Sequence, residues 1–230
     1  VLDKDMALDG KNPMPGIVRC AEDGPDLLAG SDGLPAAVVD YDNKDISPSD
    51  IADILLGNRS GRLPTVLSQD AGANVFLYWS GHGDSLSNGG ADEFCWRDNS
   101  RGEGFGAGLL GETLREMEFR KVLICAEPCY GEVVLRCVED IPGALGISGA
   151  SANEMSWADH WNSEGRLWMC DRFTLNLTDY LTGNPEGNFR DLFLYCAAHT
   201  LGSHARITGA ATYGNLYLES PGEFVLYGVR

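Results

Sequence analysis

Along the chain, short runs of hydrophobic residues alternate with amphipathic stretches in which hydrophobic and polar positions are mixed. The runs at 75–78 (VFLY), 122–125 (VLIC) and 144–148 (ALGIS) stop at small or polar residues, as buried parallel strands do. Apolar positions recur at helical spacing over five further stretches, 51–57, 109–119, about 131–139, about 170–182 and 188–202. Strands and helices that alternate in this way predict an α/β fold, with a mostly parallel sheet covered by helices on both faces.

Local signals refine this prediction. Ser47 is suited to cap a helix, with Pro48 in its first turn, Asp50 completing a capping box and Gly57 ending it. The Gly-rich segment 81–108 predicts a loop over the edge of the sheet at which the parallel strands end, with a short hairpin around Phe94–Arg97. Residues 1–35 and the polar segment that ends at 165 predict irregular structure, and the tail 207–227 predicts short strands.

Composition limits the class of protein. With 230 residues, 43% of them apolar, the chain suits one domain spanning 1–230. It has 34 acidic and 17 basic residues and a formal net charge of −17, which argues against a nucleic acid or an anionic membrane as partner. No apolar run approaches the roughly 18 residues that a membrane helix needs, so no membrane span is expected.

Two of the predicted strands lead to reactive side chains. His82 follows the first strand in Gly-His-Gly, and Cys129 follows the second in Glu-Pro-Cys. Because the carboxyl ends of neighbouring parallel strands meet at one edge of a sheet, the pattern predicts nucleophilic cysteine catalysis. Cys129 also precedes a predicted helix, whose dipole favours the thiolate. The backbone amides of Gly83 and Cys129 are the expected oxyanion donors.

Other interpretations are weaker. The chain has no GxSxG elbow, no His-Glu-x-x-His and no paired cysteines, so neither a serine nucleophile nor a metal or other cofactor is expected. Seven cysteines without a repeated spacing form a poor disulfide framework. Cys125, Cys137 and Cys196 lie in apolar runs and are expected in the core. The alternative that Cys129 is one more core thiol stays open at this stage, although its polar neighbours argue against it.

Several ordered motifs resemble the legumain (asparaginyl endopeptidase) family of caspase-like cysteine peptidases, which includes the catalytic subunit of the GPI transamidase. The motifs are DKDMALDGKNPMPGIV, VDYDNKDISPSDIADILLG, NVFLYWSGHG, KVLICAEPC and TYGN. The resemblance implies a caspase-like three-layer sandwich. It also implies an endopeptidase that cleaves after Asn, or after Asp, through a Cys129–His82 dyad and a thioester, with Gly83 at the oxyanion. Two positions depart from the family pattern, because Pro128 replaces Ala and Gly81 replaces Asp.

The same resemblance implies a set of substrate-binding residues, Glu127, Ser156, Trp157 and Asp171. Asp171 is also well placed to be a simple helix cap. The family's first strand, with an Arg of the specificity pocket, has no counterpart in this sequence. We expect that strand on a separate or removed N-terminal segment of the same precursor. With the Arg supplied, the pocket suits Asn; without it, the two acids suit Lys or Arg.

Three alternatives therefore remain beside an Asn-specific peptidase: a Lys/Arg-specific peptidase of the same fold, a transpeptidase or ligase, and an inactive homologue that binds peptide. All of them have a peptide or protein substrate as partner. The resemblance favours an exported, periplasmic or vesicular location over the cytoplasm.

Overall fold

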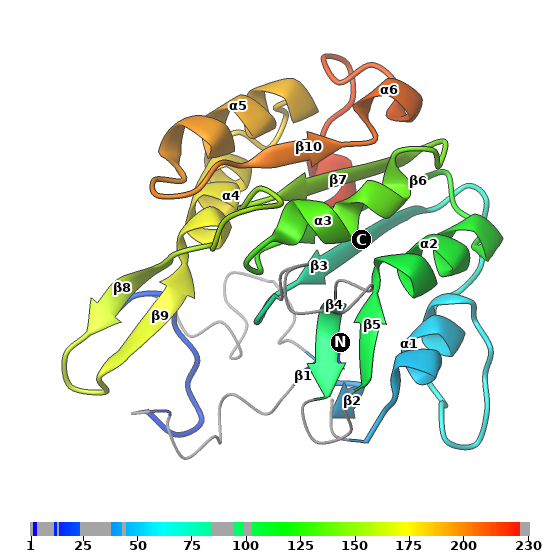
Figure 1. The fold of residues 1–230 in the computed structure, drawn as a ribbon, viewed down its shortest axis with the longest axis horizontal. Helices are drawn as coiled ribbons and strands as arrows, with labels where there is room; N and C mark the ends of the chain where they lie inside the picture. The colour runs from blue at the N-terminus through cyan, green and yellow to red at the C-terminus, as the bar shows by residue number, and fades with distance from the viewer. Residues whose placement is uncertain are drawn as a thin grey trace.

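A four-stranded sheet forms the centre of the molecule (Figure 1). The structure is a computed structural model that describes residues 2–3, 12, 14–23, 38–42, 45–83, 94–98 and 103–225. The strands are β3 (Asn74–Trp79), β6 (Lys121–Ala126), β7 (Ala144–Ser148) and β10 (Arg206–Thr208), in the order β10-β7-β6-β3. β3, β6 and β7 are parallel, and β10 runs antiparallel to β7. Trp79 lies opposite Ala126 and Ala126 opposite Ser148, so the three parallel strands end at the same level.

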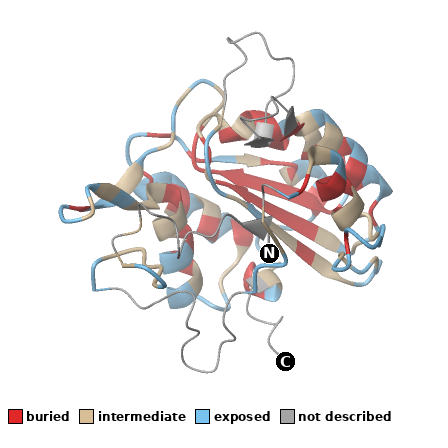
Figure 2. Cartoon of the chain, turned by 90° about the horizontal axis from the view of Figure 1, so that it is seen from below, coloured by how far each residue is buried: buried red, intermediate tan, exposed pale blue. Residues whose placement is uncertain are grey.

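Helices cover both faces of this sheet. Val122 and Ile124 of β6 point into an apolar cluster shared with α1 (Pro48–Leu55), α2 (Ala107–Glu116) and α3 (Gly131–Leu135). Leu123 and Cys125 point into a second cluster shared with α4 (Arg172–Gly183) and α5 (Phe189–His199). Figure 2 shows the buried residues gathered in the strands and in the helix sides that face them. The three-layer α/β sandwich expected from the sequence is confirmed.

The structure also confirms the local signals predicted for the first helix and for the hairpin. Ser47 caps α1: its hydroxyl accepts from the Asp50 amide at 3.4 Å, and the Ser47 amide donates to the Asp50 carboxylate at 2.7 Å. The helix ends before Gly57, whose φ of +76° is a left-handed conformation that suits glycine. The predicted hairpin exists as β4 (Phe94–Asp98) and β5 (Glu103–Gly106).

Two predictions were wrong. The segment up to 165 is not irregular throughout, because β8 (Ala158–Asn162) pairs antiparallel with β9 (Leu167–Asp171) in a surface hairpin. The helix expected from about 170 consequently begins at Arg172. The tail was expected to form short strands, but after β10 it forms two short helices, α6 (Ala210–Tyr213) and α7 (Gly222–Val225).

The remaining elements are small. The helix expected over about 131–139 is α3 followed by a 3-10 turn, η2 (Arg136–Val138). β1 (Leu2–Asp3), which lies in the segment 1–35 predicted to be irregular, pairs parallel with β2 (Tyr41–Asp42). Half of the predicted loop segment 81–108, residues 84–93 and 99–102, lies outside the described residues. Among the helices that the structure describes, none is long and apolar enough to cross a membrane.

Candidate active site

The ends of β3 and β6 bring the two predicted catalytic segments together. The Glu127 amide donates to the Trp79 carbonyl at 3.0 Å, which extends the pairing of the strands by one residue. At Gly83, an added Cβ atom would lie only 1.8 Å from the carbonyl oxygen of Cys129. The residue after His82 therefore packs directly against the backbone of Cys129. Only glycine permits so close an approach.

Cys129 lies at the edge of the sheet and in neither apolar cluster. Its thiol is half-buried, and the sulfur is 3.6 Å from the Ser156 hydroxyl. The chain turns sharply here: Tyr130 is left-handed with φ 60°, and the Gly131 amide donates to the Pro128 carbonyl at 3.1 Å. The interpretation of Cys129 as a core thiol is therefore not supported.

Two of the three thiols predicted to lie in the core differ clearly from Cys129. Cys125 and Cys196 are fully buried between the sheet and α5. Burial raises the pKa of both thiols, that of Cys196 to about 12. Cys137 is half-buried and packs against the other cluster. Complete burial suppresses thiolate chemistry, so Cys125 and Cys196 are not competing nucleophiles. Cys137 was expected in the core, but it lies only at the margin of the cluster.

His82 is exposed, directly precedes Gly83, and follows Gly81, whose φ of +134° is a glycine conformation. Among the residues that the structure describes, the N–H groups of Gly83 and Cys129 donate to no acceptor. Two backbone donors without a protein acceptor beside a thiol are suited to hold a developing oxyanion.

Glu127, two residues before Cys129, accepts four hydrogen bonds. One carboxylate oxygen accepts from the Tyr78 hydroxyl at 2.6 Å and the Thr174 hydroxyl at 2.7 Å. The other accepts from the Ser80 hydroxyl at 2.6 Å and the Gly81 amide at 3.3 Å. The carboxylate therefore ties the ends of β3 and β6 to the first turn of α4. Its lone pairs are largely occupied.

The Tyr78 hydroxyl remains a donor to this carboxylate. It is enclosed by Glu127 and Thr174, although 38% of the residue as a whole is exposed. Burial of the hydroxyl and the neighbouring Glu127 charge hold the pKa of Tyr78 well above its usual range. The proton therefore stays on the tyrosine at any ordinary pH.

Asp171 is the last residue of β9 and caps α4. Its Oδ1 accepts from the Phe173 amide at 2.7 Å and the Thr174 amide at 3.2 Å, so the expected capping role is confirmed. Burial, and then the Glu127 charge, raise the pKa of Asp171 to about 7. A cap with so high a pKa carries a proton for part of the time at neutral pH.

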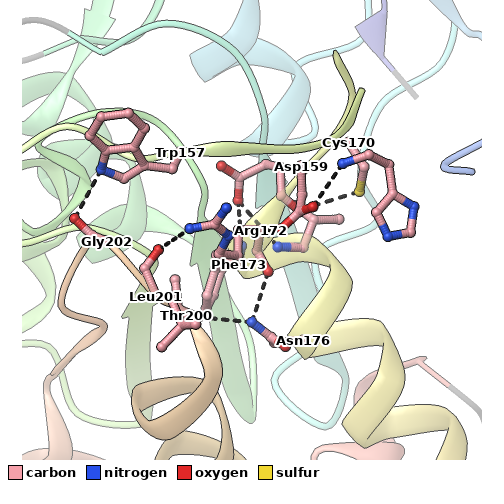
Figure 3. Close-up of polar contacts among 12 residues, drawn as sticks. Trp157, Asp159, Cys170, Arg172, Phe173, Asn176, Thr200, Leu201 and Gly202 are labelled. Carbon is pink, nitrogen blue, oxygen red and sulfur yellow. Dashed lines mark hydrogen bonds and ion pairs between the residues drawn. The ribbon is translucent and has the colours of Figure 1, made fainter. Parts of the chain in front are cut away.

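Ser156 and Trp157 come from the segment between β7 and β8. The Trp157 carbonyl accepts from the Arg172 amide at 2.9 Å, and its indole N–H donates to the Gly202 carbonyl at 2.9 Å (Figure 3). The Arg172 guanidinium pairs with Asp159 at 2.8 Å and also donates to the Leu201 carbonyl. These contacts fix the Trp157 ring at the surface, where the residue is 49% exposed.

Sequence analysis missed the donors that surround Glu127, which are Tyr78, Ser80 and Thr174. A signal for the first two was present: they alternate with Trp79, which packs against an apolar cluster and stacks on Phe105. Side chains two residues apart on a strand share a face, so Tyr78 and Ser80 had to lie together. Thr174 had no comparable signal, because only the tertiary structure places α4 beside this strand.

Comparison with known proteins identifies the family of the chain. A sequence model of the peptidase C13 family matches residues 1–220. The chain belongs to the peptidase C13 family, the legumain family of cysteine peptidases. The resemblance drawn from the motifs is therefore confirmed.

Individual relatives in this family are distant. The chain is 25% identical over 207 residues to a candidate GPI-anchor transamidase of Caenorhabditis elegans, covering 86% of this chain and 61% of the relative. It is 24% identical over 222 residues to the legumains of Rattus norvegicus and Homo sapiens, covering 92% of this chain and 46% of each relative. The chain thus spans about half to three fifths of the length of these relatives.

A solved structure supports the fold. The crystal structure of a Geobacter sulfurreducens protein matches with a TM-score of 0.51 and 16% sequence identity, covering 80% of this chain and 82% of the other. At this identity the match concerns the fold alone.

Proposed function

We propose that the chain is a cysteine endopeptidase of the legumain type, in which Cys129 is the nucleophile and His82 the general acid. The observation that supports the proposal is the backbone contact between Gly83, the residue after His82, and Cys129 at the ends of β3 and β6. Membership of a peptidase family supports the reaction class.

The chemistry follows from this arrangement. The Cys129 thiol passes its proton to His82 and the sulfur attacks the carbonyl carbon of the scissile peptide, whose oxygen becomes an oxyanion held by the Gly83 and Cys129 amides. The peptide C–N bond then breaks while His82 donates a proton to the leaving amine. A thioester on Cys129 remains. Water, losing its proton to His82, attacks the thioester and releases the acid product together with the free thiol.

Recognition of the residue before the scissile bond is proposed to depend chiefly on Asp171. Glu127 already accepts four hydrogen bonds from both of its oxygens, whereas the Phe173 and Thr174 amides both donate to a single oxygen of Asp171, Oδ1. With its pKa near 7, Asp171 can donate to an amide oxygen when protonated and accept from an amide N–H₂ when ionised. Asparagine offers both groups. Ser156 and Trp157 are proposed to border the same pocket.

A preference for Lys or Arg is the alternative for this pocket. An ionised Asp171 beside Glu127 would attract a cation, and this attraction should grow as the pH rises through 7. Initial rates on fluorogenic peptides that differ only in Asn, Asp or Arg before the reporter, measured at pH 5.5 and 8, separate the two. The proposed preference predicts the highest kcat/KM for Asn at both values. Faster cleavage after Arg than after Asn at both pH values would refute the Asn preference and support the preference for Lys or Arg.

Ligation is a second candidate function, because one relative carries the name of a transamidase. An amine nucleophile in place of water would resolve the same thioester into a new peptide bond. Adding a Gly-initiated peptide to the assay and measuring the joined product by mass spectrometry gives the ratio of ligation to hydrolysis.

The nucleophile itself is tested by Cys129→Ala, with Cys137→Ala as the control that removes a thiol outside the site. We expect Cys129→Ala to lose hydrolysis and labelling by a peptidyl acyloxymethyl ketone, and Cys137→Ala to retain both. If the native protein is labelled at Cys129 but cleaves no member of a peptide library, the inactive peptide-binding alternative is correct. Hydrolysis retained by Cys129→Ala would refute the mechanism.

A further inference from the structure

The segment 14–23 lies against the β8–β9 hairpin. In Figure 1 this blue segment passes beside the two yellow-green strands. The contact has two anchors: the Asn162 side chain of β8 donates to the Glu22 carboxylate at 3.0 Å, and the Cys20 side chain is hydrogen-bonded to that of Cys170 on β9. Asn162 is buried at its contact. An early segment of the chain is thus held against a hairpin about 150 residues later.

The two sulfur atoms are in a setting unlike that of the core thiols. Cys20 and Cys170 are both half-buried, and neither belongs to an apolar cluster. The Cys170 thiol also lies 3.3 Å from the Asp171 carbonyl oxygen. The pair is therefore open to a small reagent and adjoins, through Cys170, the residue that caps α4.

We propose that Cys20 and Cys170 form a reversible disulfide that fastens segment 14–23 to the β8–β9 hairpin. The two thiols are neighbours on separate segments, and the second anchor keeps these segments together. A cross-link can therefore form between them without a large movement of the chain. The cross-link does not depend on the proposed peptidase activity.

The oxidant is a low-molecular-weight disulfide such as oxidised glutathione. The Cys20 thiolate attacks one of its sulfurs, the S–S bond breaks, and one glutathione leaves as a thiolate. The Cys170 thiol then loses its proton and attacks the Cys20 sulfur of the mixed disulfide, which releases the second glutathione. Two protein thiols are oxidised and one small disulfide is reduced to two thiols. Excess reduced glutathione reverses both steps.

The electrostatics assign the attacking thiol. The hydrogen bond from Cys170 lowers the pKa of Cys20 to about 7, against the opposing effects of burial and of the Glu127 charge. The same hydrogen bond, followed by burial, raises the pKa of Cys170 far above its usual range. A thiol with a pKa near the ambient pH attacks small disulfides fastest, so Cys20 reacts first and Cys170 resolves the intermediate.

The experiment uses the full chain with Cys129→Ala, which removes the proposed nucleophile and any self-cleavage. The protein is equilibrated in glutathione buffers from reducing to oxidising at pH 7.5, quenched in acid, alkylated and digested without reduction. We expect mass spectrometry to find Cys20 and Cys170 in one linked pair of peptides that separates on adding dithiothreitol. Cys125 and Cys196, which are neighbours but fully buried, serve as the internal control and should stay alkylatable only after unfolding.

Cys20→Ser and Cys170→Ser are the matched variants. In the oxidising buffer, Cys170→Ser should accumulate a stable glutathione adduct on Cys20, whereas the parent should not. The parent's melting temperature should be higher oxidised than reduced, and neither Ser variant should show this increase. The proposal is overturned if both thiols remain alkylatable in every buffer, if each carries its own glutathione, or if oxidation leaves the melting temperature unchanged.

Discussion

Asp171 combines two properties that rarely occur together, a helix-capping role and a pKa near 7, and this gives a sharp prediction for the variant Asp171→Asn. Asparagine caps a helix about as well as aspartate and has nearly the same size, so the bonds from the Phe173 and Thr174 amides are kept. The variant removes only the charge and the titration.

The size of the effect on the free energy of unfolding follows from the raised pKa of Asp171. An ordinary aspartate has a pKa of 3.8, and in the folded protein burial and the Glu127 charge raise that of Asp171 to about 7. Between these values the folded chain keeps a proton that the unfolded chain releases, so the free energy of unfolding falls as the pH rises and the loss is complete above pH 7. At about 1.4 kcal/mol per pKa unit the full cost is about 4 kcal/mol. Because the residue is only partly buried, we expect about 1–3 kcal/mol in practice.

Urea unfolding at pH 4 and pH 8.5 measures this cost. The groups that face Asp171 are Glu127, Tyr78 and Cys170, and the variant leaves all of them in place. We expect Asp171→Asn to match the parent at pH 4 and to exceed its free energy of unfolding at pH 8.5. Asp179→Asn, an exposed change on the same helix, is the control and should show no such dependence. An equal difference between Asp171→Asn and the parent at both pH values would refute the reasoning.

Two further predictions concern Gly83 and Glu154. Gly83→Ala places a methyl group 1.8 Å from the Cys129 carbonyl oxygen, so one oxyanion donor should be displaced and kcat should fall by about 100-fold or more, whereas Gly61→Ala, which meets no atom within 4 Å, should leave steady-state kinetics unchanged. Although burial opposes it, hydrogen bonds from His204 and from a backbone amide hold the pKa of Glu154 at about 2, so its stabilising effect is present above about pH 4.5 and is lost as the pH falls through 2. Glu154→Gln should therefore lower the melting temperature at pH 6 and have little effect near pH 2, and an equal decrease at both would contradict this assignment.

The sequence was most informative where one physical requirement determines each residue. The run Lys121–Ala126 is apolar on both sides because β6 is buried under helices on both faces, so no other element fits that run. The capping box at Ser47 and Asp50 is equally local, since both hydrogen bonds form within one helical turn. Predictions of this kind need no knowledge of the remaining chain.

The β8–β9 hairpin was missed because its strands lack the alternation of a half-buried sheet. Trp161 and Trp168 are 49% and 55% exposed, and they stack edge to face with each other rather than on the core. What holds the hairpin is its ladder of backbone hydrogen bonds, which is invisible in a hydrophobic pattern. The hairpin carries Asp171, which ends β9 and caps α4, so the position of this residue could not be predicted either.

The charge of the proposed substrate pocket could not be predicted from the sequence pattern either. Counting Glu127 and Asp171 as two free acids predicts a strongly acidic pocket, and motif matching alone supports that count. The structure changes it, because Glu127 is enclosed by donors from β3 and α4, and Asp171 has a pKa near 7. The first carboxylate thereby acts as a positioning group that joins three elements, and we propose that the second sets the charge presented to a substrate. Substrate preference in this chain should accordingly follow the protonation of one residue rather than the number of acids nearby.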